Sequence, residues 1–255
     1  MIIGLKFTPS DLAYYTKGKS FPSVISTTIS DTFSAVLFPI MSKLQDDKAQ
    51  LLTYTRKFIS AASFLVFPLM LGFFAISDNF IRVVLTEKWL SASIYIKIFC
   101  LSYMFIIIQN ANLHTIKAVG RSDILLKMEI MKKGLYFLVI VLFLLFGRTP
   151  EILAVACILN TIIATIINTY PNQKLIGYSY GLRISDIKTN LISSIVMCII
   201  VSLINMLKIQ NTTLLLLLQV IVGISVYIAL AVITKNKNLE MIKATILKKM
   251  QGNHL

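Results

Sequence analysis

The sequence predicts an all-α membrane protein, a polytopic helical bundle with about seven transmembrane helices. Apolar residues fill 56% of the 255 positions and charged residues only 14%, and the mean hydropathy is +0.80. Soluble domains usually carry about 25% charged residues. Seven apolar stretches reach the roughly 20 residues that a helix needs to cross a bilayer core. A chain of this length cannot bury all seven in one soluble core, so we expect lipid to surround them.

The predicted spans alternate with short loops, which leave no room for a soluble domain. In chain order they are 20–42, 52–77, 92–116, 124–147, 151–172, 188–207 and 212–234. We divide the chain into residues 1–19, the seven-span bundle at 20–234, and a basic amphipathic tail at 235–255. The first part is expected to hold the remnant of a preceding span at 1–6, then an interfacial helix that begins beside Pro9 and Asp11. The charged segment 78–90 is too short to span and predicts a second interfacial helix.

The Lys and Arg residues gather in alternate loops, which predicts how the chain crosses the membrane. Basic residues are frequent in 43–57, 117–133, 174–188 and 235–249, and sparse in the loops between them. Loops on the cytoplasmic side carry this excess in membrane proteins. The rule places the C-terminus in the cytoplasm. It also accounts for most of the net charge of +14 without a nucleic-acid partner.

The sequence lacks the patterns that carry catalysis or hold a metal. Its three cysteines, Cys100, Cys157 and Cys198, lie inside apolar spans without a paired spacing. It contains no phosphate-binding glycine loop, no HExxH and no serine nucleophile elbow. We therefore expect no enzyme, no cofactor and no metal. Polar stripes inside the spans point instead to a transporter.

The first polar stripe surrounds Asp31 in the first span. It also includes Ser23, Thr27, Ser30 and Ser34, whose spacings of three and four place them on one helical face. An ionisable group inside a span suggests a function by default. The stripe can line a water-filled cavity, with Asp31 coupling to a proton or cation. It can equally form a helix–helix interface in which small polar groups meet a neighbouring helix.

The third span carries a lysine and a polar cluster. Lys97 lies about one turn inside the outer end, where it can extend to the interface or meet an anionic group of a substrate. Asn110 and His114 share a face further along the helix. For His114, a proton relay and a hydrogen-bonded helix-end histidine are both open.

Three further features inside the spans are candidates. Lys132 enters the fourth span close to Glu129 and Lys133, which have the favourable i, i+4 spacing for an ion pair. Asn160 begins a second polar stripe in the fifth span. Pro68 should bend the second span and is a possible hinge. The remaining members of the Asn160 stripe are Thr161, Thr165 and Asn168.

Three runs of sequence resemble bacterial polysaccharide flippases of the colanic-acid-exporter and O-antigen-transporter type. They are LFPIMSKLQDD at 37–47, LTEKWL at 85–90 and ANLHTIKAVGRSD at 111–123, with IG at 3–4 and LAYY at 12–15 before them. These flippases share a superfamily with the multidrug and toxin extrusion (MATE) antiporters and the lipid II flippase. The resemblance is collinear from about residue 3 to 135.

The resemblance implies a two-lobed, MATE-like transporter in the bacterial inner membrane. Such a transporter moves an undecaprenyl-pyrophosphate-linked oligosaccharide repeat by alternating access, for lipopolysaccharide, O-antigen or exopolysaccharide biosynthesis. Cationic residues are expected to meet the pyrophosphate, and Lys97 and Lys132 are the first candidates here. The chain matches the C-terminal half only. It is therefore expected to be a truncated form that needs a missing N-terminal lobe or a second copy.

Other functions are open at this stage. A multidrug or cation antiporter of the same superfamily would share the bundle, and the chain could be a non-functional remnant. A membrane-embedded polymerase or glycosyl-phosphate transferase should show a large outside loop with arginine clusters, or an acidic metal motif. The pair Asp46 and Asp47 is the sole acidic doublet of that kind, and its position predicts a helix start.

Overall fold

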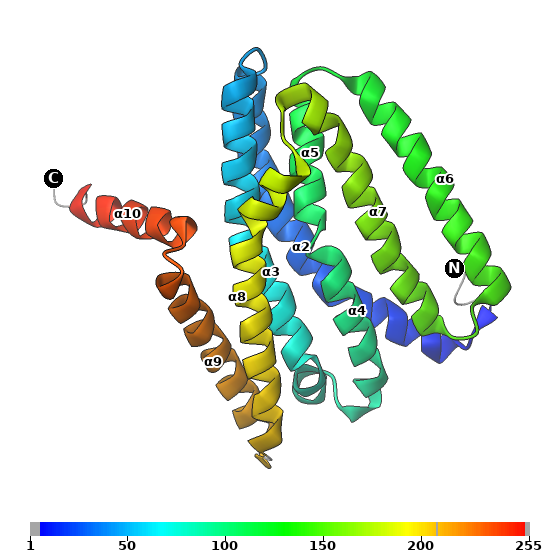
Figure 1. Ribbon diagram of the computed structural model, residues 1–255. Helices are drawn as coiled ribbons and strands as arrows, with labels where there is room; N and C mark the ends of the chain where they lie inside the picture. Colours follow the sequence, from blue (N-terminus) through cyan, green and yellow to red (C-terminus); the bar gives the residue numbers. More distant parts are fainter. Residues whose placement is uncertain (1–5, 208, 253–255) are drawn as a thin grey trace.

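The computed structural model describes residues 6–207 and 209–252, and every regular element within them is a helix (Figure 1). The all-α prediction is thus confirmed. Apart from Lys6, the predicted remnant at 1–6 lies outside the described residues. The helices are α2 (Pro9–Lys43), α3 (Lys48–Val84), η1 (Glu87–Ala92), α4 (Ser93–Tyr103), α5 (Ile106–Ala118), α6 (Ser122–Phe146), α7 (Pro150–Ile176), α8 (Tyr180–Leu203), η2 (Ile204–Leu207), α9 (Thr212–Ile233) and α10 (Lys237–Gly252).

Six segments of the described chain are long and apolar enough to cross a membrane. They are α2, α3, the run 87–118, α7, the run 180–207 and α9. The predicted span 124–147 does form a helix, α6, but α6 is not among the six. Its first half carries Lys127, Glu129, Lys132 and Lys133. Length and composition therefore support six spans, where the sequence analysis expected about seven.

The helix boundaries differ from the predicted ones in two places. Helix α2 begins at Pro9, where Thr8 and Asp11 form a reciprocal capping box, and it continues without a break to Lys43. The predicted separate interfacial helix before residue 20 is therefore absent. The interfacial helix expected at 78–90 is also wrong, because α3 runs through it to Val84. Asn79 and Ile81 on that last part of α3 are buried in the bundle, so packing extends the helix past its charged residues.

Helix α3 is the centre of the bundle. It contacts α8, α4, α5 and α9, and its buried side chains Ile59, Phe67 and Met70 form much of the core. On the other side of the molecule α6 lies beside α7 (Figure 1). Helix α10 turns away from α9 and extends to the side of the bundle (Figure 1).

The contact between α2 and α4 depends on a glycine. A Cβ atom on Gly18 would lie 2.4 Å from the Cβ of Tyr95 and 2.8 Å from the carbonyl oxygen of Ala92. No side chain fits between the two backbones at this point. Gly18 therefore lets α2 approach α4 closely enough to hold the N-terminal half of α2 on the bundle.

Candidate functional site

Half of the predicted stripe around Asp31 is an interface between α2 and α5. The amide of Asn110 donates to the Ser30 hydroxyl, and Nε2 of His114 lies 2.8 Å from Oγ of Ser34. The Ser26 hydroxyl donates to the carbonyl oxygen of Tyr103 at 3.2 Å, where α4 gives way to α5. The structure thus brings Asn110 and His114 onto the serines of α2. These groups hold two helices together.

The other half of the stripe is uncovered. Thr27 and Asp31 of the predicted stripe are exposed, and so are their neighbours Thr28 and Thr32. The Thr27 hydroxyl donates to the Ser23 carbonyl at 2.9 Å and that of Thr32 to the Thr28 carbonyl at 2.8 Å, so these two hydroxyls are satisfied within α2. Across the described chain the Asp31 carboxylate has neither a hydrogen bond nor an ion pair. The face of α2 at 27–32 is named the open polar face below.

Lys97 has a partner inside the chain. Its ammonium lies 2.7 and 2.9 Å from the two carboxylate oxygens of Asp78 on α3. Both side chains are partly exposed, at 31% and 47%. The ion pair joins α4 to the end of α3. The Lys97 ammonium is therefore neutralised by Asp78 and does not meet a substrate anion in this state.

Lys132 is also paired, although the sequence analysis expected Lys133 to pair with Glu129 instead. It forms an ion pair with Glu129, three residues before it. The expected pair of Glu129 with Lys133 does not form, and Lys133 is exposed. The cation of Lys132 is therefore compensated on its own helix.

The stripe that begins at Asn160 meets α5. The side-chain amide of Gln109 donates to the Thr161 carbonyl at 3.2 Å and to the Thr165 hydroxyl at 3.0 Å, and Asn168 donates back to Gln109. Asn160 itself is half-buried and takes no part in these bonds. The stripe is thus a contact between α5 and α7, and the sequence analysis overlooked Gln109 as its partner.

Pro68 lies inside α3, which continues through it. A proline has no N–H, so the carbonyl of Phe64 four residues earlier loses its partner in the helix. The hydroxyl of Tyr227 on α9 donates to that carbonyl at 2.8 Å. The break is therefore held by a neighbouring helix, and the role of Pro68 as a hinge stays a prediction.

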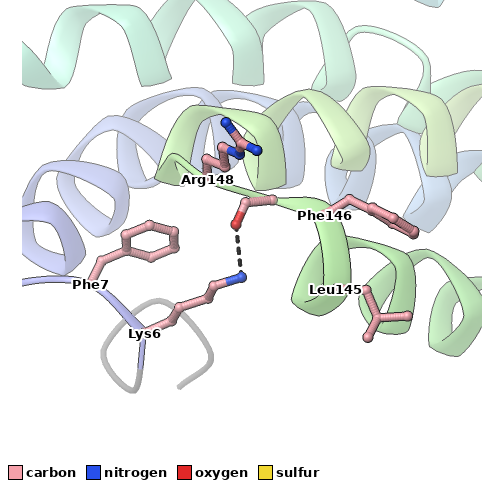
Figure 2. A pocket seen from close by; sticks show the side chains of 6 residues that line it. Lys6, Phe7, Leu145, Phe146 and Arg148 are labelled. Carbon is pink, nitrogen blue, oxygen red and sulfur yellow. Dashed lines mark hydrogen bonds between the residues drawn. The ribbon is translucent and has the colours of Figure 1, made fainter.

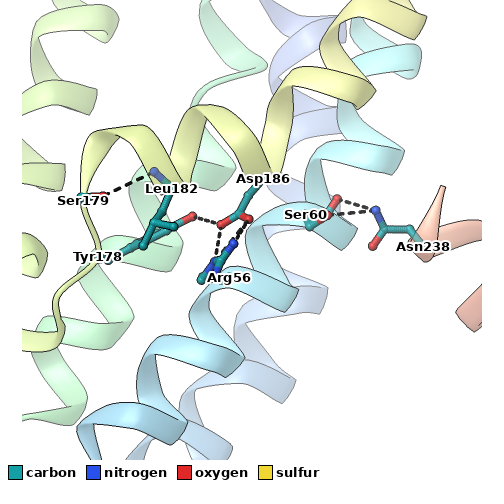
Figure 3. A network of polar contacts seen from close by, with 7 residues as sticks. All are labelled: Arg56, Ser60, Tyr178, Ser179, Leu182, Asp186 and Asn238. Atoms are coloured by element: carbon teal, nitrogen blue, oxygen red, sulfur yellow. Dashed lines mark hydrogen bonds and ion pairs between the residues drawn. The ribbon is translucent and has the colours of Figure 1, made fainter. Parts of the chain in front are cut away.

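A charged cluster that the sequence analysis missed joins α3 to α8 (Figure 3). Arg56 makes a two-pronged ion pair with Asp186, with Nη2–Oδ1 at 2.7 Å and Nε–Oδ2 at 2.9 Å. The hydroxyl of Tyr178, in the turn after α7, donates to Asp186 Oδ2 at 2.9 Å. Burial and then the charge of Asp186 raise the pKa of the Tyr178 phenol. Because 130 residues separate Arg56 from Asp186, no local spacing could reveal the pair.

Beside this cluster lies a buried arginine. Arg183 is 5% exposed and donates to the carbonyl oxygens of Thr169 and Tyr178, both at 3.0 Å. Its guanidinium carbon lies 4.3 Å from the centre of the Tyr178 ring. It therefore fixes the turn between α7 and α8.

A hollow of about 490 Å³ opens where α6 ends (Figure 2). The ammonium of Lys6 donates to the carbonyl oxygens of Leu144 and Gly147, at 2.8 and 2.7 Å, and so ties the start of α2 to the end of α6. Nowhere in 6–207 and 209–252 do three or more metal-ligating side chains come together. The residues that line the hollow are Lys6, Phe7, Leu145, Phe146, Gly147 and Arg148.

The sequence is similar to known polysaccharide biosynthesis proteins. Residues 1–94 match a protein-family model described as "Polysaccharide biosynthesis protein". The chain is 30% identical over 114 residues to the lipopolysaccharide biosynthesis protein WzxC of Escherichia coli (strain K12). The matched residues cover 45% of the chain and 23% of that protein. The predicted resemblance to the polysaccharide flippase family is confirmed.

Two further relatives support this resemblance over different lengths. An uncharacterized membrane protein in the cps region of Klebsiella pneumoniae is 25% identical over 228 residues, which cover 84% of the chain and 44% of that protein. The teichuronic acid biosynthesis protein TuaB of Bacillus subtilis (strain 168) is 24% identical over 124 residues, 49% of the chain and 26% of that protein.

The fold is similar to that of a solved flippase. The lipid II flippase MurJ in an inward closed conformation superposes with a TM-score of 0.70 at 18% identity, covering 88% of the chain and 47% of that protein. At this identity the likeness concerns the fold. The chain spans less than half the length of the proteins it matches. Together with its apolar helices, the comparisons make it a multi-pass membrane protein with a polysaccharide flippase resemblance.

Proposed function

We propose that this chain forms one lobe of a flippase that moves a lipid-linked oligosaccharide across the bacterial inner membrane. The cargo would be an undecaprenyl-pyrophosphate-linked repeat unit used for lipopolysaccharide, O-antigen or exopolysaccharide biosynthesis. The relatives named for polysaccharide biosynthesis and the fold likeness to a lipid II flippase support this proposal. The excess of basic residues in alternate loops supports a cytoplasmic C-terminus.

The open polar face of α2 is the observation that carries the proposal. A carboxylate that faces lipid costs about 2.5 kcal/mol or more at the bilayer centre and less towards the headgroups. Asp31 is exposed within an apolar helix, so this face should meet water or another polar surface. A water-filled path between two lobes would satisfy it, and the chain matches only 47% of the flippase of similar fold. The second lobe would come from another chain or another copy.

The same face fits a sugar chain chemically. Thr27, Thr28 and Thr32 present hydroxyl groups beside Asp31, and carboxylates and hydroxyls are natural hydrogen-bond partners for the hydroxyls of a saccharide. The pyrophosphate needs a cation. Lys97 and Lys132 would supply one only in a state in which Asp78 and Glu129 release them. Such a process needs no covalent step, which agrees with a transporter and not an enzyme.

A deletion and complementation experiment tests the proposal. Deleting the gene in its source bacterium should abolish surface polysaccharide and cause lipid-linked repeat units to accumulate, and the wild-type gene should restore export. D31N should reduce export at least tenfold at equal protein level, whereas E87Q, which neutralises an exposed acid in η1, should export normally.

Two results would contradict the proposal at different levels. Unchanged surface polysaccharide and unchanged lipid-linked intermediates in the deletion strain would show that the chain is no flippase component. Normal export from the D31N strain would leave the flippase assignment intact but remove the open polar face from the transport path.

A further inference from the structure

The turn between α9 and α10 is held in place by buried amides. Asn236 donates to Oδ1 of Asn190 on α8 at 2.8 Å, and Asn238 donates to Oγ of Ser60 on α3 at 3.0 Å (Figure 3). The three asparagines are 2% to 8% exposed. Lys235 adopts a left-handed backbone conformation with φ of 48°, which residues with a side chain disfavour. The start of α10 is thus fixed to α3 and α8 against a local backbone preference.

This fixed angle leaves a groove between α10 and the bundle. The groove has a volume of about 400 Å³ and is apolar except for the Asn238 amide. Leu65 on its wall is 42% exposed and Ile242 is 46% exposed, so the groove has an open side. It is lined by Phe33, Ala61, Phe64, Leu65, Asn238, Met241 and Ile242.

The helix beside the groove is basic. The sequence of α10 holds four lysines and one acid, Glu240. Lys237 and Lys243 are exposed, and so is Lys57, one turn before Ala61 on α3. An apolar groove with a cationic rim is complementary to an amphiphile with a negative head.

We infer that this groove binds an anionic glycerophospholipid, with an acyl chain between α3 and α10 and the headgroup phosphate beside the lysines. Helix α3 is one of the segments long and apolar enough to cross a membrane, while α10 extends to the side of the bundle from the end of α9 (Figure 1). Their junction therefore lies where the hydrocarbon meets the headgroups. A basic amphipathic helix binds most firmly there when apolar burial and charge act together. The site is independent of the proposed transport activity.

Native mass spectrometry of the purified full chain tests the site by counting retained lipids. Phosphatidylglycerol and phosphatidylcholine with identical acyl chains are the probes. Each lysine near an anionic surface contributes roughly fivefold in affinity, so K237Q/K243Q should bind phosphatidylglycerol on the order of 25-fold more weakly. K43Q/K127Q, which removes two exposed lysines away from the groove, should bind it like the wild type. L65W should fill the groove and release both lipids.

The alternatives give different outcomes. Equal retention of the two lipids by the wild-type chain, or equal losses in the two double variants, would overturn the anionic site. Competition by free glycerol 3-phosphate as strong as that by phosphatidylglycerol would show that no acyl chain occupies the groove. Stoichiometric displacement by a polyprenyl diphosphate would assign the groove to the cargo instead. If L65W does not fold, as judged by its helix content, the lysine variants alone decide.

Discussion

The hydroxyl of Tyr227 should stabilise the bundle only because Pro68 interrupts α3. It donates at 2.8 Å to the Phe64 carbonyl, whose normal partner would be the N–H of residue 68. The Tyr227 side chain is 7% exposed, and its ring centre lies 5.3 Å from that of Phe64. Y227F removes the donor and keeps this packing. Because the hydroxyl also interacts with Ser194, a double-mutant cycle with Pro68 is needed to isolate the bond to Phe64.

The expected magnitude follows from two ranges. Leaving a buried acceptor unpaired costs about 1–3 kcal/mol in proteins generally, while hydrogen bonds between membrane helices average about 0.6 kcal/mol and reach about 1.7. We therefore expect Y227F to lower the free energy of unfolding by about 1 kcal/mol. P68A supplies an N–H for Phe64. In the P68A background, Y227F should cost close to zero, which gives a coupling of about 1 kcal/mol.

The assay is reversible unfolding of the purified chain in mixed micelles, with the four members of this double-mutant cycle compared side by side. Y54F is the matched control, because it removes the hydroxyl of an exposed tyrosine on α3, the helix that holds Pro68, and should change stability little. An equal loss from Y227F in both backgrounds, or no loss in either, would refute the idea that Tyr227 compensates for the proline.

Three other changes have defined outcomes. G18V should destabilise the fold by about 1–3 kcal/mol because its side chain collides with α4, whereas G134A, whose Cβ meets nothing within 4 Å, should stabilise α6 by up to about 1 kcal/mol in the same unfolding assay. If Lys97 only pairs with Asp78, the double variant K97M/D78M should complement export like the wild type, and loss of export at normal protein level would restore the substrate role. Hydrogen bonds from the first turn of α3 lower the pKa of Asp47, so its capping contribution should be complete above about pH 4 and decline as the pH falls through the lowered pKa. Unfolding followed from pH 6 to pH 2 should show that decline in the wild type, and D47A should lack it.

Local sequence patterns predicted the features that depend on neighbouring residues. Hydropathy located the helices, and Asp47 caps α3 through the backbone N–H groups of Ala49 and Gln50, as the acidic pair predicted. The helix start beside Pro9 and Asp11 was also predicted, and the structure forms a capping box with Thr8 there. Periodicity placed Ser30 and Ser34 on one face. These signals are reliable because they arise within one or two helical turns.

The partners of the polar groups depended on contacts between distant segments. Sequence alone left Lys97 free to meet a substrate, but α3 brings Asp78 to it. Periodicity placed Asp31 on the same face as Ser30 and Ser34, yet those serines meet α5 while Asp31 stays uncovered.

The sequence by itself determined that this is a helical membrane protein, since lipid solvation selects long apolar helices whatever their arrangement. Its short motifs also determined the resemblance to polysaccharide flippases. Only the tertiary structure decided which polar groups are paired and which face is open. The pairs of Tyr227 with Phe64 and of Arg56 with Asp186 join positions 163 and 130 residues apart. The crossing of helices brings such groups together, and no spacing along one helix encodes that crossing.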